Sequence, residues 1–149
     1  MKRVVATGTF DLLHPGHIYY LEESAKLGDE LHVIVARDAN VRHKPRPVIP
    51  EEQRRRMIAS LKPVDYAVLG DLHDMFRPIE AIRPAVITFV FNQHFDEEKI
   101  QQALQERGLT IDLVRIGSYS GDPYCSSRQI IRRVLDRYEC TGKDEESTL

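Results

Sequence analysis

Short apolar runs and segments with helical periodicity alternate along the chain. The apolar runs are nearly continuous and rich in valine and isoleucine, which is typical of strands buried on both faces of a parallel sheet. On this basis the sequence predicts five strands, over Arg3–Ala6, Leu31–Ala36, Tyr66–Leu69, Ala85–Phe89 and Thr110–Ile116.

Helices are predicted between these strands. Gly28 directly follows the first predicted helix and Gly108 the fourth, and glycine commonly ends a helix in this position. Asp96 is a candidate N-cap for the fourth helix. The predicted helices span His17–Leu27, Glu51–Leu61, Met75–Ile82, Asp96–Arg107 and Ser126–Glu139. This alternation predicts an α/β fold, a Rossmann-like, doubly wound parallel sheet of five strands with helices on both faces. In such sheets ligands bind beyond the carboxyl ends of the strands, so the residues after each strand are the candidates for chemistry.

The composition fits a single domain over residues 1–139, followed by a polar tail over 140–149. The 149 residues are 42% hydrophobic, which is enough for a core.

The formal net charge of −2 argues against a nucleic-acid partner. No apolar run approaches the roughly 20 residues that span a bilayer, so no membrane partner is expected. With two cysteines, Cys125 and Cys140, no disulfide framework is predicted and a cytoplasmic location is expected.

The loop after the first predicted strand contains the strongest chemical signal. It reads G-T-F-D-L-L-H-P-G-H over residues 8–17 and leads into a helix. His14 and His17 are three residues apart, so at a helix start both imidazoles face the same way and can donate to one phosphate group. Gly8 allows close approach of the backbone to a ligand, and the helix start supplies free N–H groups. The sequence therefore predicts a phosphate site in this loop.

The G-T-F-D-x-x-H-x-G-H pattern resembles the signature of the cytidylyltransferase-like nucleotidyltransferases. Within that family the chain is most similar to archaeal-type FAD synthases, through Gly8–His17, Ile49–Arg54, Asn92–Glu98 and Cys125–Ser127. The resemblance implies a reaction of FMN with ATP that gives FAD and pyrophosphate, by in-line attack of the acceptor phosphate on the α-phosphorus. It further implies Mg²⁺ bound to the phosphates and a homodimer.

The same resemblance assigns roles to particular residues. The catalytic candidates are His14, His17, Lys44 and Arg54, of which Lys44 lies in a basic loop and Arg54 near a helix start, both expected to contact phosphate. The candidates for nucleotide binding are Thr9, Phe10, His14, His17, Asn92, Ser126 and Ser127. For Ser126 and Ser127, a role as helix N-cap is an alternative that is compatible with phosphate binding.

Three further residues bear on the chemistry. Asn92 stands where related enzymes usually have aspartate, and asparagine loses the charge but gains donors, which bears on the acceptor. Asp11 orients either the metal or His14, or has a structural role in its turn. Cys125 is either an oxidation-sensitive thiol at a helix N-terminus or an isolated cysteine.

The residues also leave alternative functions open. These are transfer of CMP or AMP to another phosphorylated acceptor, such as glycerol 3-phosphate or phosphopantetheine, and nucleotide binding without catalysis. A tRNA-charging enzyme is disfavoured, because the chain has no K-M-S-K-S element.

Overall fold

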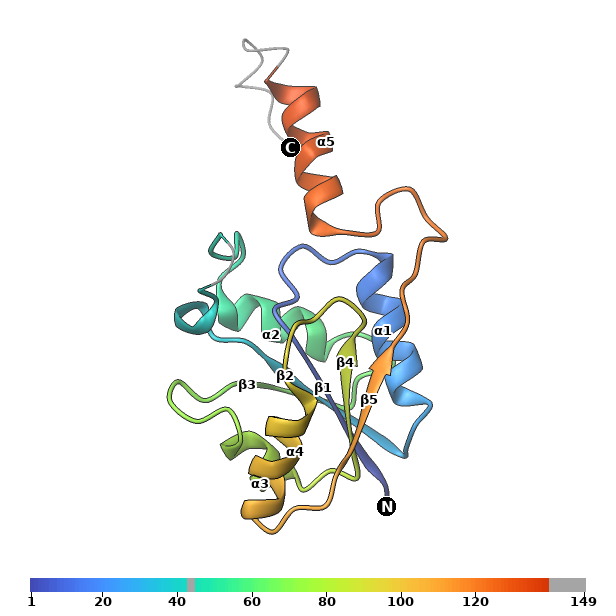
Figure 1. The fold of residues 1–149 in the computed structure, drawn as a ribbon. Coiled ribbons are helices and arrows are strands. Elements are labelled where there is room, and N and C mark those ends of the chain that lie inside the picture. Colours follow the sequence, from blue (N-terminus) through green and yellow to red (C-terminus); the bar gives the residue numbers. More distant parts are fainter. Residues whose placement is uncertain (43–44, 140–149) are drawn as a thin grey trace.

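A computed structural model describes residues 1–42 and 45–139, and it places a five-stranded sheet between two layers of helices (Figure 1). All strand pairs are parallel, and the strand order is β3-β2-β1-β4-β5. The strands are β1 (Arg3–Gly8), β2 (Glu30–Val35), β3 (Tyr66–Leu69), β4 (Val86–Val90) and β5 (Asp112–Ile116). The predicted doubly wound α/β fold is confirmed, whereas the tail predicted over 140–149 lies outside the described residues.

Five α-helices and a short 3₁₀ helix connect or follow these strands in the described part of the chain. They are α1 (Pro15–Ala25), η1 (Asp38–Asn40), α2 (Glu51–Ala59), α3 (Arg77–Ile82), α4 (Glu97–Glu106) and α5 (Ser127–Tyr138). The strand order reverses between β1 and β4, which are neighbours in the sheet. The loops after these two strands therefore flank the switch point at which ligands bind in doubly wound sheets.

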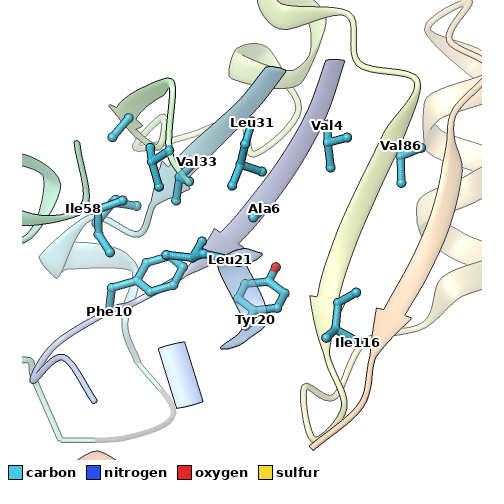
Figure 2. Packing of buried hydrophobic residues seen from close by; sticks show 13 residues of the cluster. Val4, Ala6, Phe10, Tyr20, Leu21, Leu31, Val33, Ile58, Val86 and Ile116 are labelled. Carbon is cyan, nitrogen blue, oxygen red and sulfur yellow. The ribbon is translucent and has the colours of Figure 1, made fainter. Parts of the chain in front are cut away.

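The core is divided between the two faces of the sheet. Side chains alternate along β1, so Val4 and Ala6 pack in one cluster and Val5 in the other. The first cluster includes Leu21 of α1 and Ile58 of α2, whereas Leu104 of α4 belongs to the second (Figure 2 shows the first cluster). Thus α1 and α2 cover one face and α3 and α4 the other.

A buried polar network fixes α1 at the switch point. The hydroxyl of Tyr20 donates to the carbonyl of Thr88 in β4 at 2.8 Å, and the hydroxyls of Ser24 and Thr88 lie 2.8 Å apart. Burial raises the pKa of Tyr20 to about 12, so the hydroxyl keeps its proton and remains a donor. Because His14 caps α1 and His17 lies in its first turn, this network helps to set the position of both histidines relative to β1 and β4.

The helix ends depart from the predictions in two informative ways. Helix α1 begins at Pro15, two residues early, because the side chain of His14 caps it. Gly28 is not the left-handed residue expected after α1; it is needed because a Cβ there would lie 2.6 Å from the carbonyl oxygen of Lys2. Gly108 does adopt the left-handed conformation after α4, with φ of 74°.

Within residues 1–42 and 45–139, no helix is both long and apolar enough to cross a membrane. Helix α5 differs from the others in its surroundings. None of its residues is buried, and it extends beyond the carboxyl edge of the sheet, away from both helical layers (Figure 1).

Candidate functional site

His14 and His17 lie together at the start of α1, as their spacing predicts. Their ring centroids are 3.7 Å apart, with an angle of 29° between the planes. The Nδ1 atom of His14 accepts the N–H of Gly16 at 3.1 Å, so a neutral His14 ring has its proton on Nε2. Partial burial lowers the pKa of His14, which favours this neutral form. The ring can therefore cap α1 and present an N–H donor at the same time.

The loop before α5 packs directly against this histidine motif. A Cβ on Gly16 would lie 2.8 Å from the carbonyl oxygen of Cys125 and 2.9 Å from the ring of His14. The hydroxyl of Ser127 donates to the carbonyl of Leu12 at 3.3 Å. The structure thus brings together two helix N-termini, those of α1 and α5, from opposite ends of the chain.

The N-terminus of α5 is closed by a capping arrangement. Ser126 is the N-cap, and its hydroxyl accepts the N–H of Gln129 at 3.2 Å. The side chain of Gln129 in turn accepts the N–H of Cys125 at 2.8 Å, much as in a capping box. The thiol of Cys125 donates to the carbonyl of Asp122. Ser126 therefore has a structural role at the helix start, where the N–H groups of the first turn also favour anions.

Phe10 has an unusual conformation for its residue type. Its φ is 55°, a region that bulky residues rarely adopt, and only 3% of the residue is exposed. The ring lies against Gly8, where a Cβ would come within 2.8 Å of it. The Phe10 side chain is thus a buried packing residue, and what it offers to a ligand at this edge is its backbone. Such strain is common at functional sites, and no sequence pattern around Phe10 indicates it.

Arg54 is buried, with 1% of the residue exposed. Its guanidinium donates to the carbonyls of Ile49, Thr9 and Ala36 at 2.6–2.9 Å, and to the carboxylate of Asp38 at 2.6 Å. These bonds connect the start of α2 to the loops after β1 and β2. The structure therefore places Arg54 beneath the Thr9 loop, with its donors engaged by protein groups.

Asp11 connects the same loop to the segment before α2. Its two carboxylate oxygens accept the N–H groups of Val48 and Ile49, both at 2.9 Å. Of the alternatives left open by the sequence, this geometry supports the structural role. The predicted phosphate ligand Lys44 lies outside the described residues.

Asn92 lies in the loop after β4, one strand away from the histidine loop. It is exposed and lines an open pocket of about 470 Å³. Arg115 of β5 stabilises this loop by donating to the carbonyls of Val90, Phe91 and Gln93. Sequence reasoning missed Arg115 and Gln93; for Arg115 the one available signal was a charged residue among the apolar residues Leu113, Val114 and Ile116 of its strand.

Residues 1–42 and 45–139 contain no group of three or more histidine, cysteine or acidic side chains that could hold a metal ion.

Known proteins match this chain over almost its whole length. Residues 5–133 match the model of the family described as cytidylyltransferase-like. A protein named FAD synthase from Methanolacinia petrolearia is 63% identical over 148 residues, which cover 99% of each chain. Another FAD synthase, from Methanoculleus marisnigri, is 70% identical over 136 residues, which cover 91% of each chain.

A solved structure gives the same picture of the fold. The lipopolysaccharide core biosynthesis protein of Thermoplasma volcanium is 46% identical, with a TM-score of 0.78, and the match covers 80% of this chain and 99% of that one.

Proposed function

The chain belongs to the cytidylyltransferase-like family, and from this premise we propose that it is an FMN adenylyltransferase, which joins FMN to the AMP part of ATP and releases pyrophosphate. The acceptor and the nucleotide follow from the relatives named FAD synthase, at 63% and 70% identity. The observation on which the chemistry depends is the meeting of the α1 and α5 N-termini beside two stacked imidazoles. Free N–H groups and helix dipoles at such termini favour a polyphosphate.

In the proposed reaction an oxygen of the FMN phosphate attacks the α-phosphorus of ATP in line with the leaving pyrophosphate. The bond from the α-phosphorus to the bridging oxygen of the pyrophosphate breaks as the new phosphorus–oxygen bond forms. The protein supplies position and charge stabilisation, and no side chain becomes a covalent nucleophile. Nε2 of His14 and the ring of His17 donate to phosphate oxygens on which negative charge develops.

Four other predicted residues act around this centre in the proposal. The N–H groups of Ser126 and Ser127 at the start of α5, and the Lys44 ammonium, bind the remaining phosphates. Arg54 acts as a positioning residue, because its guanidinium already donates to the carbonyls of Thr9 and Ala36. It holds the loop that carries the histidines rather than contacting phosphate itself.

Magnesium enters this proposal with the nucleotide. The described residues offer no multi-ligand protein site, and the carboxylate of Asp11 is occupied by two backbone N–H groups. The side chains of the described site therefore fit an ion that is bound chiefly by phosphate oxygens and water, as Mg²⁺ usually is at nucleotides. When bound, the ion neutralises phosphate charge.

The proposed oligomeric state is a homodimer formed through α5. Ile131, Val134 and Leu135 lie on one side of this helix and are all exposed, Val134 by 48%. An amphipathic helix normally buries such a stripe, and none of its residues is buried within its own chain. Packing of α5 against the same helix of a second copy buries both stripes in one isologous interface.

An assay panel tests the proposed function. ATP or CTP is combined with FMN, glycerol 3-phosphate or phosphopantetheine, and pyrophosphate and the adduct are measured. We expect FAD from FMN and ATP, and no product from the other pairs. Product with a different acceptor would show a different transferase, and nucleotide binding without any turnover would show a binding module.

A further inference from the structure

The pocket after β4 has the size and position of an acceptor site. Its volume of about 470 Å³ lies within the range of about 300–1,000 Å³ typical of small-molecule sites. It is lined by Phe91, Asn92, Gln93, His94, Phe95, Asp96 and Arg115. Because β4 pairs with β1 in parallel, this loop and the histidine loop lie at the same edge of the sheet. A substrate whose phosphate reaches the histidines can extend its other end toward this pocket.

The pocket is preorganised by Arg115. Its guanidinium donates to three carbonyls of the loop, pairs with Glu97 at 3.2 Å and lies 4.4 Å from the ring centre of Phe95. The ring of Phe95 packs on Phe89 of β4, with centroids 3.9 Å apart. A loop held in this way loses little entropy when a ligand binds.

Two side chains of this pocket have unused binding capacity. The Oε1 atom of Gln93 is buried and has no hydrogen-bond partner in the described structure, which costs free energy. Turning the carboxamide into the pocket relieves this cost if a ligand donor is present. In the same loop, Phe91 is 54% exposed as a residue, and its ring offers an apolar surface for a flat ligand ring.

We propose that Gln93 binds the imide edge of the isoalloxazine ring of FMN, and that Phe91 packs on its face. An imide presents one N–H donor between two carbonyl acceptors. A carboxamide presents an acceptor and a donor side by side, so Gln93 Oε1 accepts the imide N–H while its amide group donates to a ring carbonyl. This inference rests on the proposed FMN adenylyltransferase function and assigns the part of the acceptor that is recognised.

The test compares FMN with 3-methyl-FMN, in which a methyl group replaces the imide hydrogen. Dissociation constants are measured by flavin fluorescence in the presence of α,β-methylene-ATP, with wild type, Gln93→Ala and Gln102→Ala. Gln102 is an exposed glutamine of α4 and serves as the matched control. We expect wild type and Gln102→Ala to bind 3-methyl-FMN about tenfold more weakly than FMN, because the buried acceptor stays unpaired. Gln93→Ala should bind both flavins equally, and as weakly as wild type binds 3-methyl-FMN.

Equal binding of the two flavins by wild type, or unchanged FMN binding by Gln93→Ala, overturns the assignment of Gln93. If the same wild-type preparation still makes FAD from FMN and ATP, the proposed function stands without it. Failure of the wild type to make FAD overturns the function and this inference together.

Discussion

His14 has two tasks that require the same protonation state. Its Nδ1 atom accepts the Gly16 N–H to cap α1, and only the other nitrogen is then available to donate to a substrate. Protonation of Nδ1 removes the cap, because an imidazolium has no acceptor. The neutral ring therefore serves both the helix and the proposed chemistry.

Removal of either imidazole should abolish most turnover while the fold remains. By analogy with single oxyanion donors, His14→Ala and His17→Ala should each lower kcat by about 10²–10³. His73→Ala, which removes an exposed histidine after β3, should leave kcat unchanged. Steady-state rates of FAD formation, with circular dichroism to check folding, decide the matter; a near-normal rate in either variant contradicts the proposed role.

The cap also predicts a pH dependence of stability. Desolvation holds the pKa of His14 below its ordinary value of 6.5, so the unfolded chain binds this proton more tightly than the folded chain. The contribution to stability is thus complete above about pH 6.5 and is lost as the pH falls through the folded-state pKa. Urea unfolding at pH 7.5 and 5.5 should show a larger loss for wild type than for His14→Asn, in which asparagine keeps a cap without titrating. Equal losses would refute this account.

Arg54 should contribute to stability more than its neighbour Arg55. Replacement of Arg54 by methionine leaves several carbonyl oxygens and Asp38 without their donor, and each buried unsatisfied group costs about 1–3 kcal/mol. We expect the free energy of unfolding to fall by at least about 2 kcal/mol. Arg55→Met removes a surface ion pair with Glu52 and a long hydrogen bond of 3.3 Å to the carbonyl of Ala67, and it should cost less than about 1 kcal/mol. Urea denaturation compares the two; similar losses would mean that the buried network is not a stabilising feature.

At the scale of elements, the contact between α1 and α5 depends on a glycine. No side chain fits at Gly16, because a Cβ would meet the Cys125 carbonyl and the His14 ring. At Gly117, by contrast, nothing lies within 4 Å of an added Cβ. Alanine at Gly117 therefore serves as a control for the general effect of replacing a glycine, whereas alanine at Gly16 also disturbs the junction of α1 and α5.

Gly16→Ala should displace the start of α5 from the histidines. We expect kcat/KM for ATP to fall by about 10²-fold, since displacements near 1 Å have effects of this size, whereas Gly117→Ala should retain wild-type kinetics. Thermal unfolding should show that both variants fold. Retention of full kcat/KM by Gly16→Ala would argue that the junction has no role in nucleotide binding.

At the scale of the whole molecule, the exposed stripe of α5 predicts a dimer that a single charge introduced into the stripe can disrupt. Wild type should sediment as a dimer and Val134→Glu as a monomer, because a carboxylate in the centre of an apolar interface is not compensated. Arg132→Glu changes an exposed arginine of the same helix and should remain dimeric. Sedimentation velocity distinguishes the outcomes; a monomeric wild type would exclude this interface.

The local pattern determined the strands, the helices and their order. Continuous valine- and isoleucine-rich runs that alternate with helical segments are typical of a parallel sheet covered on both faces, and short crossovers of fixed hand then leave few topologies. The paired histidines at a helix start were also evident, because helical geometry alone brings residues three apart to one side.

Tertiary structure alone decided the contacts between distant segments. It buried Arg54 under the Thr9 loop, placed Cys125 against Gly16, and gave Gly28 a packing role instead of a helix-ending one. Sequence patterns describe neighbours along one element, whereas these contacts join loops that meet only when parallel strands align their carboxyl ends. The physical reason is that the burial of a group and its hydrogen-bond partners depend on which segments surround it. Those segments come together only in the folded chain.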